Sequence, residues 1–112
     1  MRTLEFDVSR QKITKTKGCS FSHLIAGSTG YLKAKFNFSD DGHAWAGCVR
    51  AASFWKDGIE YAVLLDSDNS CDIPDEVVNG RNFYVSVTGL IKGVESDYKI
   101  KTNKIKIIQG VG

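Results

Sequence analysis

The sequence predicts an all-β fold: an immunoglobulin-like antiparallel β-sandwich of seven to eight strands. Apolar and polar residues alternate with a period of two in several short segments, of which residues 32–38 form the clearest. Turn-forming residues separate these segments at intervals typical of two packed sheets. No segment carries a long amphipathic helical pattern, so a doubly wound α/β fold is excluded.

The first half of the chain predicts two strand regions separated by a loop. Residues 4–8 alternate, and a short continuation at 11–15 follows them. Residues 16–29 show no period and predict a loop whose apolar side chains tuck under the domain: Phe21, Leu24 and Ile25. In the next strand the side chains expected to face the core are Leu32, Ala34, Phe36 and Phe38, and those expected to face water are Tyr31, Lys33, Lys35 and Asn37.

The middle of the chain predicts a hairpin. Residues 45–55 are apolar on both phases, which indicates a central strand covered on both faces, with Cys48 as a small core residue. The pair Asp57-Gly58 then favours a two-residue turn into a returning strand over 59–65.

The last third predicts one short helical turn, near residues 74–78, and two more strand regions. Asp72 and Pro74 suit the start of that turn, and Asn79-Gly80 its end. Residues 83–87 alternate, and residues 98–109 follow with a phase slip at Thr102-Asn103-Lys104. The slip requires either a bulge or an edge strand that changes its partner sheet.

Length and composition predict a single domain over residues 1–112. A 42% apolar and 25% charged composition is that of an ordinary globular chain, and a net charge of +2 argues against a strong nucleic-acid binder or a membrane anchor. Apolar runs are too short to span a bilayer, and residues 1–7 lack an apolar signal core. We therefore expect no membrane contact and use inside the cell that makes the protein.

Catalytic and metal-binding motifs are sparse. His23 and His43 are the two histidines, and no nucleophile motif accompanies them, which predicts a non-enzyme with no catalytic residue and no cofactor. Three cysteines (Cys19, Cys48 and Cys71) show no zinc-type spacing and no even disulfide count.

Residues 66–72 resemble a calcium loop in having oxygen-bearing side chains at alternate positions. Cys71 stands where the sharp turn needs glycine, and Val77 stands where the bidentate acid belongs. We interpret this segment as a solvated acidic turn, and no metal site is predicted.

A lysine cluster on the final strand has two interpretations. It comprises Lys99, Lys101, Lys104 and Lys106. Nucleic-acid binding would require these lysines on one face with aromatic residues between them. The phase slip predicts that they are divided between two faces, so we favour lysines that guard an exposed sheet edge against aggregation.

Three aromatic residues are candidate interface residues: Tyr31, Trp45 and Tyr84. Tyr31 and Tyr84 fall on the outward phases of their strands, and Trp45 falls at a strand start. Exposed aromatic side chains are enriched at interfaces, although partial burial at the sandwich rim is the equal alternative.

Read end to end, the chain resembles the immunoglobulin-like N-terminal domain of the baseplate upper protein family of phages and prophages of Gram-positive bacteria. The resembling segments are, in chain order, Leu4–Val8, Gly30–Ser39, Trp45–Cys48, Cys71–Val77, Phe83–Gly89 and Lys101–Lys104. The resemblance implies a β-sandwich that joins virion parts, in a particle assembled in the bacterial cytoplasm. Family members continue beyond the point that corresponds to Gly112, so we expect an accessory domain rather than a receptor-binding protein.

The main hypothesis is therefore a non-enzymatic structural or accessory protein of a phage or prophage particle, in its tail or baseplate or as a decoration protein. Its expected partners are other phage structural proteins, with a homo-oligomer as one arrangement, and many copies on a symmetric particle would let weak contacts suffice. A small inhibitor that binds a host defence protein is the alternative. A carbohydrate-binding module is a third hypothesis, based on Tyr31, Trp45 and Tyr84.

Overall fold

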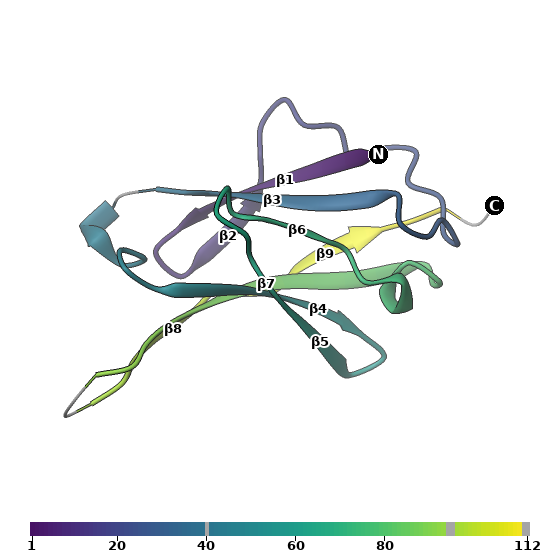
Figure 1. Ribbon diagram of the computed structural model, residues 1–112. Coiled ribbons are helices and arrows are strands. Elements are labelled where there is room, and N and C mark those ends of the chain that lie inside the picture. The colour runs from purple at the N-terminus through teal and green to yellow at the C-terminus, as the bar shows by residue number, and fades with distance from the viewer. Residues whose placement is uncertain (40, 94–95, 111–112) are drawn as a thin grey trace.

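The computed structural model describes residues 1–39, 41–93 and 96–110, and these residues form two packed β-sheets (Figure 1). Sheet one has the strand order β2-β1-β3-β6, and sheet two has the order β5-β4-β7-β8, with β9 also paired to β7. The strands of sheet one are β1 (Arg2–Ser9), β2 (Lys12–Lys15), β3 (Leu32–Phe38) and β6 (Ser70–Asp72). The strands of sheet two are β4 (Val49–Lys56), β5 (Ile59–Leu64), β7 (Asn82–Ile91), β8 (Tyr98–Lys101) and β9 (Ile105–Ile108).

The all-β sandwich is confirmed, with two differences in detail. The described residues form nine strands rather than seven or eight, since β8 and β9 are separate pieces of one edge. Sheet one is mixed rather than antiparallel, because β1 and β3 pair in parallel over the whole length of β3. The loop after β2 carries the chain back to the starting end of β1, so β3 runs in the same direction as β1 (Figure 1).

The core lies between the inward faces of the two sheets, as the alternation of apolar residues predicted. On sheet one, Phe6 and Phe36 stack with ring centroids 5.3 Å apart. They belong to the same buried cluster as the inward aromatic residues of sheet two, where the Phe54 and Phe83 centroids are 6.5 Å apart. Because burial of apolar surface is the main stabilising contribution to folding, this two-sided aromatic layer holds the sheets together.

The predicted hairpin between β4 and β5 is confirmed. Asp57 and Gly58 form the connection and both have positive φ angles, 52° and 78°. Two such residues in succession give the turn whose twist matches that of paired strands, and aspartate followed by glycine tolerates it best.

The predicted strand over residues 45–55 is wrong in its first part. β4 begins at Val49, and Trp45 and Cys48 belong to a loop that folds the indole into the end of the sandwich. A Cβ atom at Gly89 would lie 2.8 Å from the Trp45 ring, so the ring can pack there because residue 89 has no side chain. Residues 45–48 are therefore apolar because this loop closes the end of the sandwich, and not because they form a strand that is covered on both faces.

Of the two alternatives for the phase slip in the last strand, the bulge is correct, and the change of partner sheet does not occur. β8 and β9 both pair with β7, and Thr102–Lys104 lie opposite just two residues of β7, Ser86 and Val87. The extra residue projects toward β2, where Asn103 N donates to the Gln11 carbonyl and Ile13 N donates to Asn103 Oδ1 (3.0 Å). The bulge thus connects the edges of the two sheets.

The remaining connections agree with the sequence in part. A single 3-10 turn, Asp75–Val77, stands where a short helical turn was expected, and a second, Asp41–His43, was not predicted. In the loop after β2, Leu24 is buried and Phe21 packs against the core, whereas Ile25 is exposed. In the part of the chain that the structure describes, no helix is long and apolar enough to cross a bilayer.

Candidate binding face

The outward face of sheet two carries the lysine cluster of the final strand. Cross-strand partners point to the same side of a sheet, and Lys99, Lys101 and Lys106 pair with Leu90, Thr88 and Tyr84 of β7. These β7 residues alternate with inward residues that are buried, such as Val85 and Val87. The three lysines therefore point away from sheet one.

Lys104 joins the same face on the other side of the bulge. Its Nζ lies 3.7 Å from the centroid of the Trp55 ring, and Trp55 is the outward cross-strand partner of Tyr84. The prediction that the phase slip divides the four lysines between two faces is consequently wrong. Lysines and isoleucines change phase together at the bulge, so Ile100, Ile105 and Ile107 turn inward while all four lysines remain outward.

Two aromatic side chains lie beside these lysines, on neighbouring strands. Tyr84 is 40% exposed, and Trp55 is half-buried with its indole N–H donating to Ser86 Oγ at 3.0 Å. We call this surface the aromatic–lysine strip, and its residues are Trp55, Tyr84, Lys99, Lys101, Lys104 and Lys106. It combines π faces with positive charge, the pattern that sequence reasoning required for nucleic-acid binding.

A surface hollow adjoins the aromatic end of the strip. Both Trp55 and Tyr84 line it, together with Lys56, Arg81 and Asp57. The Lys56 side chain lies across Gly80. A Cβ atom at residue 80 would be 2.7 Å from Lys56 Cε, so glycine leaves the space that this side chain occupies. The two aromatic side chains thus have cationic groups on both sides.

The other half of the same face is apolar. Val49 and Leu64 are 64% and 68% exposed although they belong to regular strands. With Leu90 and Ala51 they line a hollow whose rim carries the charged residues Lys92, Asp97 and Lys99. We call Val49, Ala51, Leu64 and Leu90 the apolar patch.

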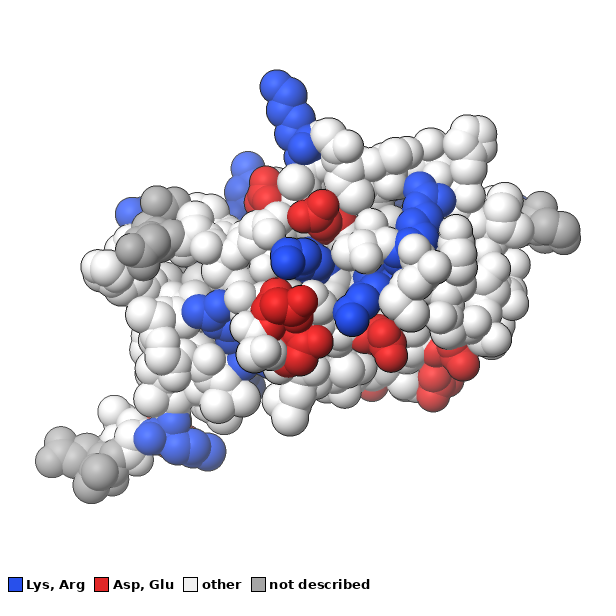
Figure 2. All heavy atoms as spheres, turned by 45° about the horizontal axis from the view of Figure 1, so that its top comes forward, with Lys and Arg blue, Asp and Glu red and all other residues white. Residues whose placement is uncertain are grey.

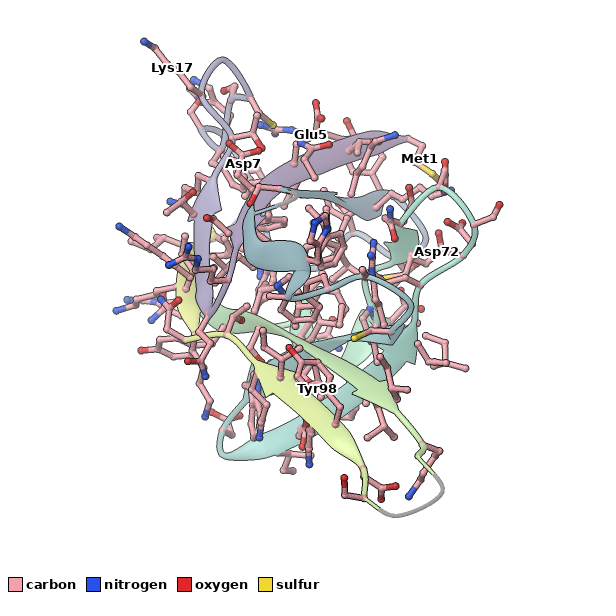
Figure 3. The ribbon with its side chains drawn as sticks, turned by 90° about the vertical axis from the view of Figure 1, so that its left-hand side faces the viewer. Met1, Glu5, Asp7, Lys17, Asp72 and Tyr98 are labelled. Atoms are coloured by element: carbon pink, nitrogen blue, oxygen red, sulfur yellow. The ribbon has the colours of Figure 1, made fainter. Side chains whose placement is uncertain are left out.

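The outward face of sheet one differs in composition. Glu5 and Asp7 of β1 lie in register with Lys35 and Asn37 of β3, so Glu5 faces an opposite charge and Asp7 faces a neutral amide. The Asp7 carboxylate accepts hydrogen bonds from Thr16 Oγ1 at 2.7 Å and Asn37 Nδ2 at 3.2 Å. Acidic and basic side chains intermix on the surface that Figure 2 brings forward, and Glu5 and Asp7 are labelled beside β1 in Figure 3.

The three predicted interface residues do not form one site. Tyr84 belongs to the aromatic–lysine strip, and Tyr31 is 48% exposed beside a separate hollow with Arg2 and His23. Trp45 is 1% exposed, and its indole N–H donates to the Arg10 carbonyl at 2.8 Å. The expectation that Trp45 presents its ring at the surface is therefore wrong, because the ring is part of the core.

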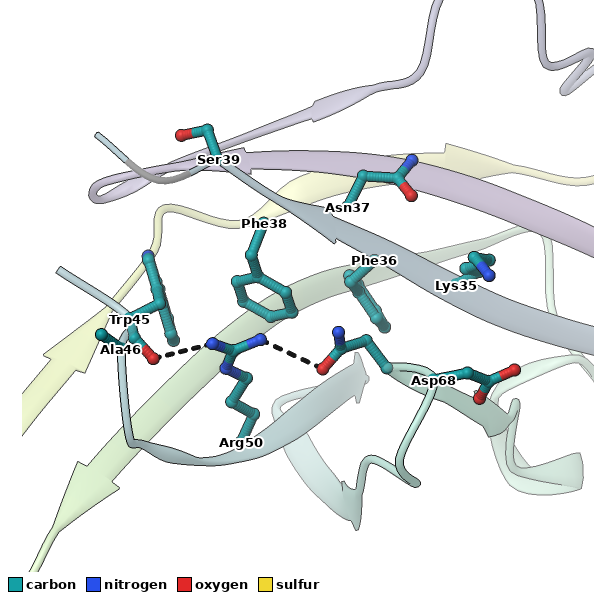
Figure 4. Close-up of a pocket in the computed structure, with 10 residues that line it drawn as sticks. Lys35, Phe36, Asn37, Phe38, Ser39, Trp45, Ala46, Arg50 and Asp68 are labelled. Atoms are coloured by element: carbon teal, nitrogen blue, oxygen red, sulfur yellow. Dashed lines mark hydrogen bonds between the residues drawn. The ribbon is translucent and has the colours of Figure 1, made fainter. Parts of the chain in front are cut away.

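A further hollow opens at the end of the sandwich that Trp45 closes (Figure 4). The Arg50 guanidinium stacks on the Phe38 ring at 4.2 Å and donates to Asn69 Oδ1 (3.2 Å) and to the Trp45 carbonyl (2.8 Å). These contacts hold the Trp45 loop and the β5–β6 turn together, which gives Arg50 a structural role.

Cys71 and the acidic turn also have structural roles in the fold. Cys71 of β6 faces the core, and its burial raises its pKa to about 12, so the thiol stays protonated at neutral pH. Hydrogen bonding with Asp68 and with the Ser70 backbone N–H lowers the pKa of Asp66, whose carboxylate caps the turn that was compared with a calcium loop. Among the described residues, no three His, Cys, Asp or Glu side chains gather as a metal site.

Sequence reasoning missed Trp55, Val49 and Leu64 as surface features. Residues 45–55 were interpreted as covered on both faces, which hid the fact that β4 has an open outward side. The sequence did contain a signal for the lysine face. Across residues 102–104 the lysines move from odd to even positions while the isoleucines move from even to odd positions, so the two sets stay on opposite sides of the strand. No protein-family model, no curated protein and no solved structure matches this chain. The candidate binding face is therefore assigned from its geometry alone.

Proposed function

We propose that this chain is a non-enzymatic structural or accessory domain of a phage or prophage particle and that it acts through protein–protein contacts. The observation that carries the proposal is the apolar patch on sheet two. Val49 and Leu64 are more than half exposed at neighbouring strand positions, where a monomer would gain solubility from polar residues.

The surroundings of the patch favour a protein as its partner. Its centre is aliphatic, and its rim carries the ion pair Lys92–Asp97, with Nζ and Oδ2 3.0 Å apart. An apolar centre with a charged, solvated rim is the usual anatomy of a protein interface. A glycan would instead need an exposed aromatic platform, which the patch itself does not contain.

The phage context rests on the order of sequence segments that resemble the baseplate upper protein family. The two-layer sandwich supports that context, since it agrees with the fold that the resemblance implies. On a particle with many copies, a patch of this modest size would suffice, because linked weak contacts strengthen one another.

The decisive experiment combines particle analysis with a patch variant. Mass spectrometry of purified particles from a producing strain should detect the chain. The double variant Val49→Asp/Leu64→Asp should fold normally but be lost from the particles, because charges would face the apolar surface of the partner.

The control is Ile25→Asp, which places one charge at an exposed apolar residue that does not belong to the apolar patch. This variant should remain on the particles. Absence of the wild-type chain from particles would reject the proposal, and retention of the double variant would remove the patch from it. Capture of a host protein by the soluble chain, with no chain on particles, would replace it with the inhibitor hypothesis.

A further inference from the structure

We propose that the aromatic–lysine strip, with its adjoining hollow, is a binding site for single-stranded nucleic acid. This inference concerns the other half of the sheet-two face and does not depend on the protein contacts proposed for the apolar patch. It reverses the expectation that nucleic acid is not a partner. That expectation depended on the small net charge and on lysines divided between two faces, and the register of β8 and β9 removes the second ground.

The charge arrangement is the first support. Four lysines point outward along one sheet edge, at a strand repeat of about 6.6 Å between alternate residues. Among the described side chains, none of the four forms an ion pair with a carboxylate, whereas Lys92 just beyond them pairs with Asp97. Unpaired ammonium groups in a row can exchange counterions for the phosphates of a nucleic-acid strand.

The aromatic pair is the second support. Tyr84 is a cross-strand neighbour of both Trp55 and Lys106, and it exposes 40% of its surface. The Trp55 ring receives a cation, Lys104 Nζ, on the outward side of the sheet. When that flexible ammonium group moves to a phosphate, the same ring face becomes available for a base to stack on.

The hollow is the third support, because it gives the strip a second positive side. Lys56 and Arg81 line the hollow together with both aromatic residues, while the lysine row lies on the opposite side of the rings. A strand could thus place a base on the rings and phosphates on both sides of them. Asp57 is the acidic residue that lines the hollow, and the Glu60 carboxylate on this face accepts a hydrogen bond from Ser53 Oγ.

The rings decide between nucleic acid and an acidic protein as the ligand. Lysines attract any polyanion, but stacking on tyrosine and tryptophan is specific for flat rings. A single strand fits better than a duplex, since the bases of a duplex already stack on one another. With a net charge of +2 for the whole chain, binding should be weak and strongly dependent on salt.

Fluorescence anisotropy with a short labelled oligothymidylate at low salt tests the proposal. The wild-type chain should bind, and the logarithm of its affinity should fall with the logarithm of salt concentration with a slope of roughly −2 to −3, as expected for three or four phosphate contacts on a single strand. Tyr84→Ala should weaken binding by about tenfold, because one stacked base is lost. The triple variant Lys101→Gln/Lys104→Gln/Lys106→Gln should bind weakly and with a clearly shallower slope, which stays above zero in magnitude because Lys99 and the cations of the hollow remain.

A charge-matched variant of the opposite face is the control. Lys12→Gln/Lys33→Gln/Lys35→Gln removes three outward lysines from sheet one and should bind as the wild type does. Val49→Asp/Leu64→Asp should also retain most of its oligonucleotide binding, which separates this site from the apolar patch. Circular dichroism of each variant verifies that it is folded.

Three results would overturn the proposal. One is the absence of oligonucleotide binding at low salt. Another is an equal loss of oligonucleotide affinity in the triple lysine variant of sheet two and in the triple lysine variant of sheet one. The third is affinity for polyglutamate that matches the affinity for the oligonucleotide and does not depend on Tyr84, which would indicate an acidic protein as the ligand.

Discussion

The two outward faces of the sandwich obey the same alternation but present different chemistry. On sheet one, Glu5 and Asp7 lie among lysines and amides, and the Asp7 carboxylate accepts two hydrogen bonds. On sheet two, lysines without described carboxylate partners stand beside Trp55 and Tyr84, and Val49 and Leu64 are exposed.

The difference shows where recognition would occur. On sheet one the Asp7 carboxylate already accepts two hydrogen bonds, so contact with a partner there would cost the desolvation of a group that is already bonded. A face with exposed aliphatic residues and unpaired cations gains hydrophobic burial and counterion release on binding. We therefore assign both proposed binding sites to sheet two.

The largest expected effect is a difference in the free energy of unfolding between variants on the core side of sheet two and variants on its outward side. Phe54→Ala should lower the free energy of unfolding by about 3–5 kcal/mol, since Phe54 is fully buried against Phe83. Leu64→Ala should change it by less than about 0.5 kcal/mol, because Leu64 is mostly in solvent already. Urea denaturation of both variants measures this contrast, and a loss above about 2 kcal/mol for Leu64→Ala would mean that the patch serves stability.

A smaller effect tests the bulge that places the lysines on one face. Deleting Asn103 removes the extra residue, so the strand would pair continuously with β7 and Lys104 and Lys106 would remain outward. The variant should fold and lose about 1–3 kcal/mol, because Asn103 no longer bonds to Gln11 and Ile13. A deletion variant that fails to fold would contradict the register that we describe.

The buried thiol of sheet one gives a pH-dependent effect. Burial raises the pKa of Cys71 from its ordinary value of 9.0 to about 12, so the unfolded chain loses this proton at lower pH than the folded chain. The free energy of unfolding should therefore decrease as the pH rises from 9 to 12, with no contribution from this group below pH 9.

Urea titrations at several pH values, compared with Cys71→Ala, isolate that contribution. The variant should be less stable at neutral pH because it leaves a cavity, but it should lose less stability between pH 9 and 12. Parallel pH curves for the two proteins would show that the thiol is not protected by the fold.

The smallest effect concerns the exposed ion pair at the rim of the apolar patch. Asp97→Asn should change the free energy of unfolding by less than about 0.5 kcal/mol, since both side chains of the Lys92–Asp97 pair are largely in solvent. Thermal denaturation measures this change. A larger loss would indicate that the β7–β8 connection contributes to folding and is more than a polar boundary of the binding face.

Local patterns in the sequence were sufficient to predict the sandwich. Alternation located the strands, and Asp57-Gly58 located a hairpin, because both depend on neighbouring residues. The parallel pairing of β1 and β3 was not predictable in this way, since it depends on where the intervening loop returns. Trp45 was misplaced for a similar reason: its burial depends on space above Gly89, which is distant in sequence.

The candidate binding face was predicted only in pieces. Tyr84 and the four lysines were identified, but their common side depends on the bulge register across β7. The exposure of Val49 and Leu64 was not evident, because an apolar strand residue is the same in sequence whether or not another layer covers it.

Lysine acetylation footprinting with and without the oligonucleotide tests most directly whether recognition belongs to sheet two. The account predicts that Lys99, Lys101, Lys104 and Lys106 become protected on binding, while Lys33 and Lys35 react at unchanged rates. Protection of Lys33 and Lys35, or equal protection of both sets, would contradict it.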